Sequence, residues 1–319
     1  MKLIRTSLRY VRTNWPRDFT TASLPKPSAG LSFRGDTYAS FDDFPFERFA
    51  RQHQYEERLI DILEGWPLGL LKIPGYCEAC TAPTTFSFKL LENETPNWRE
   101  SLACNTCHLI NRWRVSAYLA GAAIASAPAG SISYITERRS PLFDWLSDAG
   151  IDLLGSEYFG PDATPGAYRF FRGANVMHQD VTRLSFDDNS LGVVMTFDVL
   201  EHIPDYAAAI GEFLRTLRPG GQLVLSVPFS ITSESTVTRA TVNAEGEVTH
   251  LLEPEYHGDP LNGEGVLCFY NFGWDLMQTM RQAGFEQVRL MPIWSPQLGY
   301  LGVGQSFIIG TKPAPSGLR

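Results

Sequence analysis

The sequence has no long hydrophobic run and little charge. Its longest nearly apolar stretch, residues 118–129, is far shorter than the roughly 20 residues that a membrane-spanning helix needs, so we expect no transmembrane segment. Charged residues make up 19 % of the 319 residues and hydrophobic residues 44 %, a balance that excludes a largely disordered chain. Internal repeats and low-complexity tracts are also missing. The composition therefore predicts one large folded domain, or a domain with an appendage.

Acidic and basic residues are unevenly distributed. The net charge is −8, but the first 35 residues carry +6 and the remainder carries −14. We expect residues 1–40 to form an irregular basic arm tethered to the rest, with a transit peptide or a membrane-surface or partner-binding arm as the alternatives. The acidic remainder argues against nucleic acid as the main partner, because such binding relies on clustered lysine and arginine.

Cysteine is scarce, and four of the five cysteines form two pairs with the same spacing: Cys77 and Cys80, then Cys104 and Cys107. Two residues between cysteines let both thiolates face one ion, and two such pairs supply the four ligands of a tetrahedral zinc site. We predict a small structural zinc-ribbon-like module; iron in the same four-thiolate site is the minor alternative, and His108 is an unneeded substitute ligand. No signal peptide is recognisable, so we expect a cytoplasmic, reducing setting.

Hydrophobic periodicity predicts how the rest of the chain is organised. A helix over about 46–64 precedes the cysteine pairs, and a second helical stretch, about 112–127, follows them. We therefore assign residues 41–128 to the zinc module with its flanking helices. From residue 131 onward, short apolar strands alternate with helices, which predicts an α/β domain over 129–319, with a mostly parallel sheet and helices on both faces.

The end of the chain departs from this alternation. Two strand-like segments flank the turn 243–246, which ends in glycine, so we predict a β-hairpin inserted over about 232–265. A helix over about 273–283 then ends at Gly284, and two last strands complete the domain.

Polar side chains follow the predicted strands where they end. Glu157 follows the second strand, Asp180 the third and Asp198 the fourth. Ligands of a doubly wound sheet bind outside the carboxyl ends of the strands, where these residues are expected. A carboxylate placed like that of Glu157 can accept both hydroxyls of a ribose; the alternative is a solvated loop acid.

This stretch resembles the class I S-adenosylmethionine-dependent methyltransferases, and within them the type 11-like branch. The likeness rests on three elements in their usual order: LSFDDNS (184–190), DVLEHIPD (198–205) and LRPGGQLVLSVP (217–228). It covers about residues 131–312. It implies a Rossmann-like sheet of seven strands and S-adenosylmethionine as cofactor, with Glu157 on the ribose, Asp180 on the adenine amine and Asp198 nearby.

Two positions depart from that pattern. The turn after the first strand, residues 135–141, has no glycine where the family has several, so we expect Thr136 and Glu137 to contact the cofactor instead. The fourth strand opens with Leu191 and Gly192 in place of the usual Phe-Asp. A catalytically inactive methyltransferase-fold binding or scaffold protein is therefore the alternative. A nicotinamide-dependent dehydrogenase is disfavoured, because the chain lacks a G-x-G-x-x-G fingerprint.

Two histidines are the candidate catalytic residues. Methyl transfer is an in-line displacement that depends mostly on alignment, and a base is needed only where the acceptor must lose a proton. His202 follows the fourth strand, and His257 lies in PEYHGDP (254–260), which resembles an element of related methyltransferases. The alternatives are a brace for the following helix at His202 and a rigid turn at His257. By resemblance we expect a small-molecule or saccharide acceptor. Cys268 is interpreted as a buried thiol.

Overall fold

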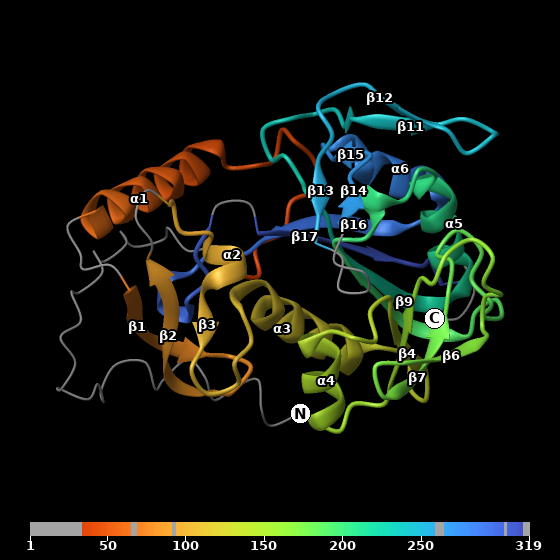
Figure 1. Cartoon of the computed structure of the whole chain (residues 1–319), viewed down its shortest axis with the longest axis horizontal. Coiled ribbons are helices and arrows are strands. Elements are labelled where there is room, and N and C mark those ends of the chain that lie inside the picture. The colour runs from red at the N-terminus through yellow and green to blue at the C-terminus, as the bar shows by residue number, and fades with distance from the viewer. Residues whose placement is uncertain (1–33, 65–68, 91–93, 259–264, 303–304, 315–319) are drawn as a thin grey trace. The chain divides into compact units, whose positions relative to one another are not determined.

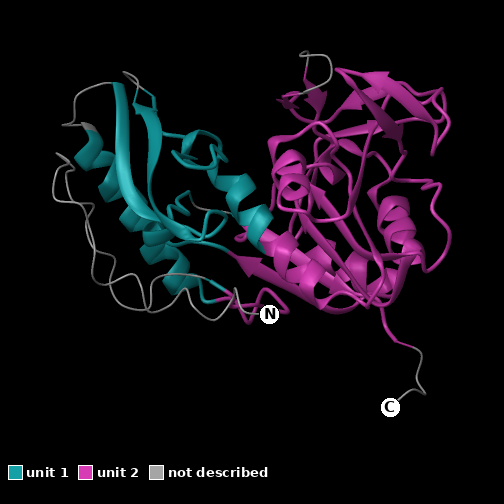
Figure 2. Cartoon of the chain, turned by 90° about the horizontal axis from the view of Figure 1, so that it is seen from below, with its two compact units in different colours: residues 1–34, 45–118, 293–305 teal, residues 35–44, 119–292, 306–319 magenta. Residues whose placement is uncertain are grey.

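The structure is a computed structural model that describes residues 34–64, 69–90, 94–258, 265–302 and 305–314. The chain forms two compact units, coloured separately in Figure 2. The first contains residues 45–118 and 293–305, and the second contains residues 35–44, 119–292 and the chain from Ser306 onward. Most of the predicted basic arm lies outside the described residues. No helix in the described ranges is both long enough and apolar enough to cross a membrane.

The first unit is built on a small antiparallel sheet beside helices. The helix predicted over 46–64 is α1. Its elements are α1 (Phe46–Glu64), β1 (Gly69–Cys77), β2 (Ala82–Leu90), α2 (Trp98–Ser101), β3 (Ala103–Cys104) and the start of α3 (Asn111–Ser126). The strands β1 and β2 pair along their whole length, from Gly69 opposite Leu90 to Cys77 opposite Ala82. β3 pairs with the middle of β2, so that Cys104 lies opposite Phe86.

Residues 293–305 join this first unit although they are far from it in sequence. The fully buried Arg114 of α3 donates to the carbonyls of Leu298 and Gly299, both at 2.7 Å. Its guanidinium also lies over the rings of Phe86 and Tyr300, 4.1 and 5.1 Å from their centroids. Side chains of the N-terminal part of the chain therefore hold residues 293–305. The hydrophobic periodicity of residues 293–305 does not predict this association.

The second unit is built on a sheet of eight strands. The four central neighbours β9, β8, β4 and β5 are parallel, β7 continues them in parallel, and β6, β17 and β16 pair antiparallel. The order is β16-β17-β9-β8-β4-β5-β7-β6. The bounds are β4 (Ile132–Ile135), β5 (Leu153–Glu157), β6 (Tyr168–Phe171), β7 (Ala174–His178), β8 (Leu191–Phe197), β9 (Leu217–Ser226), β16 (Glu286–Pro292) and β17 (Ser306–Thr311).

Helices cover both faces of this sheet, as predicted. The connection from β4 to β5 carries α4 (Pro141–Asp148), and the connection from β8 to β9, which runs the opposite way along the sheet, carries α5 (Tyr206–Thr216). Because such connections share one hand, α4 lies on one face and α5 lies on the other, together with α6 (Asp275–Ala283) (Figure 1). α4 begins at Ser140, whose hydroxyl accepts from the amide of Phe143. α6 ends at Gly284, whose φ of 115° requires glycine. The Rossmann-like architecture predicted from the sequence is therefore present.

Two features differ from the prediction. The eighth strand, β6, was not expected; it joins β7 through the turn Arg172–Gly173, both with positive φ, and its side chains are largely exposed. The apolar periodicity of Ile210, Phe213, Leu214 and Leu217 predicts a helix over about 205–218, but α5 ends at Thr216. Because the residue before a proline disfavours helical geometry, the chain is already extended at Arg218, and the Pro219–Gly221 segment lies inside β9.

The inserted hairpin forms where the turn at 243–246 predicted it. β11 pairs with β12, from Ala240 opposite His250 to Val242 opposite Val248. A second pair, β13 with β14, brings His257 opposite Val266. The short strands after β9 are β10 (Val237–Thr238), β11 (Ala240–Val242), β12 (Val248–His250), β13 (Tyr256–His257), β14 (Val266–Leu267) and β15 (Tyr270–Asn271).

The structure accounts for Gly192 at the start of β8. A Cβ there would lie 1.9 Å from the hydroxyl and 2.5 Å from the Cβ of Ser131.

We expect Gly192→Ala to lower the free energy of unfolding by about 1–3 kcal/mol, because a methyl group would be forced into a packed site. The control is Gly211→Ala on α5, where a Cβ meets nothing within 4 Å and the better helix former should stabilise the protein. Urea unfolding measures both; equal stability of Gly192→Ala and the unmodified protein would contradict the packing.

Candidate functional site

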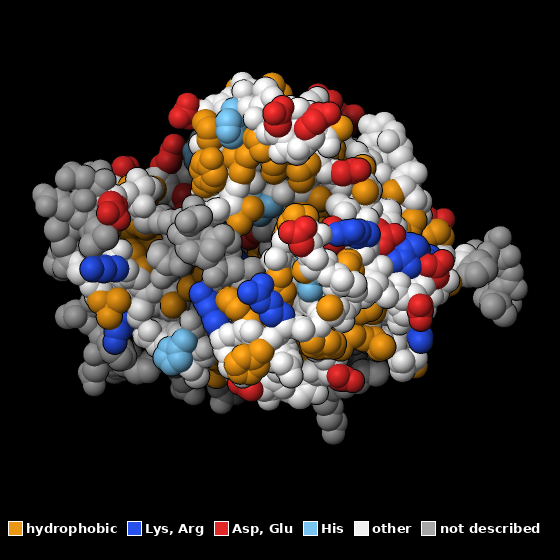
Figure 3. Space-filling model, turned by 45° about the vertical axis from the view of Figure 1, so that its right-hand side comes forward, with side chains coloured by type: hydrophobic (Ala, Val, Ile, Leu, Met, Phe, Trp, Pro, Cys, Tyr) orange, Lys and Arg blue, Asp and Glu red, His pale blue; other side chains and the backbone are white. Residues whose placement is uncertain are grey.

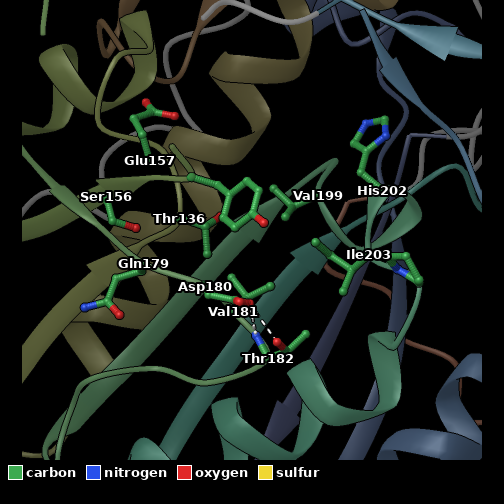
Figure 4. Close-up of a pocket in the computed structure, with 12 residues that line it drawn as sticks. Thr136, Ser156, Glu157, Gln179, Asp180, Val181, Thr182, Val199, His202 and Ile203 are labelled. Atoms are coloured by element: carbon green, nitrogen blue, oxygen red, sulfur yellow. Dashed lines mark hydrogen bonds between the residues drawn. The ribbon is translucent and has the colours of Figure 1, made fainter. Parts of the chain in front are cut away.

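A pocket of about 240 Å³ lies at the carboxyl ends of the central strands. The chain leaves β4 toward β5 and later returns to β8 on the other side of β4, so these strands define a topological switch point, where sheets of this class bind ligands. Figure 4 shows Glu157, Ser156 and Gln179 on one side, Val199, His202 and Ile203 on the opposite side, and the 180–182 turn between them. The lining residues are Thr136, Ser156, Glu157, Tyr158, Gln179, Asp180, Val181, Thr182, Val199, His202, Ile203 and Pro204.

Glu157 is fixed by the turn that lacks glycine. Its Oε1 accepts from the backbone amides of Arg138 and Arg139, at 2.9 and 2.7 Å, and the residue is 8 % exposed. A glycine-rich turn would offer such amides to a ligand; here a carboxylate of the protein engages them. The turn and the end of β5 are thereby held together, and the carboxylate is oriented at the rim of the pocket.

Asp180 is held as an anion at the end of β7. Its Oδ1 accepts from the amide and hydroxyl of Thr182, at 3.0 and 2.7 Å, and its Oδ2 lies 3.0 Å from Arg183 Nε. Burial acts to raise the pKa of Asp180, but these hydrogen bonds and the Arg183 charge bring it below its usual range. The pocket therefore carries a fixed negative group on the floor between its two sides.

The predicted cofactor residues divide into two groups. Thr136, Glu157 and Asp180 line the pocket, whereas Glu137 and Asp198 do not. Asp198 follows β8 with a φ of 55°, and its Oδ1 accepts from the hydroxyl of Ser226 at 3.1 Å. The apolar side formed by Val199, Ile203 and Pro204 was not predicted, although these residues belong to the same 198–205 motif.

The two candidate catalytic histidines lie together, and Cys268 joins them. The imidazole centroids of His202 and His257 are 5.2 Å apart, and one ligand atom from each of these residues and from Cys268 lies within 4.8 Å of the others. Cys268 Sγ is 4.0 Å from His202 Nδ1. Cys268 is buried, as predicted. Its neighbours make it part of a polar cluster at the edge of the pocket, and this cluster was not predicted from the sequence.

Glu201 completes this cluster. It is fully buried, and its Oε1 lies 3.4 Å from His257 Nδ1 and 3.7 Å from His202 Nε2. Among the described residues, neither carboxylate oxygen has a regular hydrogen bond. Burial raises the pKa of Glu201, whereas the hydrogen bond with Cys268 and the Glu201 carboxylate raise the pKa of His257 to about 10. As a free side chain, His257 would be a cation at neutral pH and could not accept a proton from a substrate.

The four paired cysteines also meet, in the first unit. Their sulfurs all lie within 4.8 Å of one another, with Cys77 and Cys107 at 3.9 Å and Cys80 and Cys104 at 3.8 Å. A tetrahedral zinc ion with bonds of about 2.3 Å places its sulfurs about 3.8 Å apart, so the arrangement fits such an ion. Burial and the neighbouring Cys77 raise the pKa of Cys80 to about 12, so that a thiolate there needs a cation beside it.

Each cysteine pair is followed by a residue with a left-handed backbone. The residue after the second cysteine of each pair is left-handed, with φ of 52° at Thr81 and 61° at His108. The amide of His108 donates to the carbonyl of Cys104 at 2.9 Å, and the amide of Thr106 donates to its sulfur. His108 thus serves the turn through its backbone, and it is not among the four clustered ligands.

Comparison with known proteins connects this pocket with a family. Residues 143–225 match the family model described as "Methyltransferase domain". A Mycolicibacterium smegmatis protein named "Probable S-adenosylmethionine-dependent methyltransferase" is 33 % identical over 89 residues, which are 28 % of this chain and 34 % of that protein. The demethylmenaquinone methyltransferase of Staphylococcus epidermidis is 43 % identical over 49 residues, which are 15 % of this chain and 20 % of that enzyme. Residues 143–225 of the second unit are therefore similar in sequence to a methyltransferase domain.

These matches are partial. The chain spans about a third or less of the length of the relatives it matches. Among solved structures, an S-adenosylmethionine-dependent methyltransferase from Mesorhizobium loti aligns with a TM-score of 0.36 and 18 % identity, over 60 % of this chain and 95 % of that one.

Proposed function

We propose that this protein transfers a methyl group from S-adenosylmethionine to a small-molecule or saccharide acceptor. The observation that carries the proposal is the pocket at the topological switch point, which has Glu157 and Asp180 at the ends of adjacent strands and lies mostly within the segment that matches a methyltransferase domain. Two acidic groups at this place suit the ribose hydroxyls and the adenine amine of that cofactor.

The cofactor is assigned to the side of the pocket formed by β4, β5 and β7. There Glu157 would accept from the ribose, Asp180 from the adenine amine, and Thr136 would contact the cofactor from the end of β4. Glu137 and Asp198, which flank the pocket without lining it, are proposed to support these contacts. The chain's contribution is to hold the sulfonium in line with the acceptor, because the methyl group is already activated.

The acceptor is assigned to the side that carries His202. In the transfer, a bond forms between the acceptor atom and the methyl carbon, the carbon–sulfur bond breaks, and its electron pair stays on sulfur. A hydroxyl acceptor must also lose its proton to solvent, and we assign that deprotonation to the edge of the pocket formed by His202 and His257.

A small acceptor agrees with the size and charge of the surroundings. The pocket, of about 240 Å³, is of a size that suits a small ligand rather than a macromolecule. On the face drawn in Figure 3, acidic and basic side chains are interspersed over the described residues, without a broad basic field of the kind that nucleic acid requires.

For the four cysteines we propose a structural zinc ion. Cys77, Cys80, Cys104 and Cys107 would fill all four positions of a tetrahedral ion, which leaves no open position for chemistry. The fit of the sulfur distances supports this role. Because thiolate–zinc sites of this kind are typical of reducing compartments, we place the protein in the cytoplasm.

Glu157→Gln is expected to weaken S-adenosylmethionine binding about 10-fold to 100-fold. Glutamine can still accept from the amides of Arg138 and Arg139, so the turn is kept, but the charge-assisted bonds to the ribose, each worth about 1.5–3 kcal/mol, are reduced. Isothermal titration calorimetry with the cofactor measures the change.

The matched control is Asp152→Asn, an exposed acid just before the other end of β5, which should bind like the unmodified protein. If the unmodified protein shows no binding at millimolar cofactor, the alternative of a non-catalytic binding or scaffold protein replaces the proposal. Binding with equal affinity in Glu157→Gln would remove Glu157 from the cofactor site.

A further inference from the structure

We propose that His202, His257, Cys268 and Glu201 bind a divalent transition-metal ion of the zinc class at the edge of the pocket. This site is separate from the four-cysteine site of the first unit. In its role for the acceptor it rests on the proposed function; as a metal site it stands on the geometry of the cluster alone.

The first argument is the state of the two imidazoles. His202 Nδ1 lies 2.9 Å from the carbonyl of Leu267, and His257 Nε2 lies 3.2 Å from Oε1 of Glu255. With an ion bound in place of the second proton of His257, each ring can donate its remaining proton to that oxygen, which leaves His202 Nε2 and His257 Nδ1 to face the ion. Metal-binding histidines characteristically donate their second nitrogen to a carboxylate or a backbone carbonyl in this way.

The second argument is that the free atoms converge. His202 Nε2 and His257 Nδ1 both face Glu201 Oε1, at 3.7 and 3.4 Å. Two nitrogen or oxygen ligands of a tetrahedral zinc ion lie about 3.3–3.5 Å apart, so small side-chain adjustments would bring these atoms to bonding distance. Cys268 lies beside them, with its Sγ 4.0 Å from His202 Nδ1 and within 4.8 Å of one ring nitrogen of each histidine.

The third argument is the unsatisfied charge of Glu201. This fully buried carboxylate has only the long contacts with His257 and His202, at 3.4 and 3.7 Å, and no regular hydrogen bond on either oxygen among the described residues. Burying a charge with contacts this long is costly, and a cation bound between these groups would lower that cost. A divalent ion would be neutralised by this carboxylate and the Cys268 thiolate together.

The ligand types indicate the kind of ion. Imidazole and thiolate suit zinc and its neighbours in the first transition row, whereas magnesium prefers oxygen ligands. His202 lines the pocket, so the ion would border the acceptor side. An acceptor hydroxyl bound to such an ion loses its proton to water more readily, because the ion lowers its pKa. The acceptor oxygen would then attack the methyl group as an alkoxide, which removes the need for a neutral histidine base.

The test is metal stoichiometry. We expect the purified protein, loaded with zinc and desalted, to hold about two ions per chain by mass spectrometry, and His257→Ala and Cys268→Ala to hold about one. The control His250→Ala, on the exposed strand β12, should hold about two. Reconstitution with cobalt gives a second readout, because a site with one thiolate and two imidazoles absorbs differently from a four-thiolate site.

Three results would overturn the site. One is equal metal content in the unmodified protein and both variants; another is a single ion that is lost only with Cys104→Ser. The third is a cobalt spectrum that His257→Ala does not change. Calorimetry with S-adenosylmethionine on the same samples distinguishes the two proposals. If both variants lose one metal ion but the unmodified protein does not bind the cofactor, the metal site is supported and the methyltransferase proposal is contradicted.

Discussion

Cys104→Ser is expected to remove the zinc ion that we propose for the first unit and to unfold its sheet. A serine hydroxyl is not a ligand for this ion, and structural zinc sites contribute on the order of 10 kcal/mol to the folding of small domains. Cys104 also lies in β3, paired with Phe86, so the sheet would lose the ion and one edge together. Metal content should fall by about one ion per chain, and limited proteolysis should cut between Gly69 and Leu90 where the unmodified protein resists.

The matched control is His108→Asn. His108 lies next to the cluster but takes part through a left-handed backbone conformation, which asparagine tolerates. Its zinc content and protease resistance should equal those of the unmodified protein. A Cys104→Ser protein that keeps its full metal content and its resistance would show that the four cysteines are not a metal site.

Arg114→Met is expected to lower the free energy of unfolding by about 3–5 kcal/mol. Methionine fills most of the space between Phe86 and Tyr300, but the carbonyls of Leu298 and Gly299 would lose their donors in a buried place. Chemical denaturation followed by near-ultraviolet circular dichroism measures the loss. Hydrogen exchange should show the amide of Tyr300, which donates to the Ser295 carbonyl, exchanging faster.

Arg112→Met provides the comparison on the same helix. Arg112 forms a partly exposed ion pair with Glu100 at 2.7 Å, a kind of contact that contributes about 0–1 kcal/mol. Its removal should change stability little. If the two variants lose the same stability, the buried contacts of Arg114 do not hold the 293–305 segment.

Much of the second unit could be predicted because its pattern is local. Alternation of apolar strands and helices predicted the sheet, and glycine signals located the end of α6 at Gly284 and the hairpin turn at 243–246. β6 was missed because its side chains are largely exposed and carry no hydrophobic signal of burial. The turn Arg172–Gly173 was the one sign of it, since glycine there suits the positive φ of a tight hairpin.

The candidate site was predicted where its residues share a motif. Glu157 and Asp180 could be named because each follows a strand at a carboxyl end, and the two cysteine pairs because their spacing repeats. Cys268 could not, since it is 66 residues from His202 in sequence and the two meet only in the fold, where the amide of Phe269 donates to the carbonyl of Glu201. The hydrogen bonds from the backbone amides of Arg138 and Arg139 to Glu157 could not be predicted either, because they depend on the path of the turn.

The return of residues 293–305 to the first unit sets the order in which the protein can be completed during synthesis. Arg114, Glu56 and Asn111 emerge from the ribosome early, yet their buried partners in this segment, including Trp294 and Leu301, are translated almost last. The three-stranded sheet of the first unit can form locally, but these buried polar groups stay unpaired until the second unit is nearly finished. A nascent chain halted at residue 128 would therefore expose them, and the two units cannot be separated by a single cut in the gene.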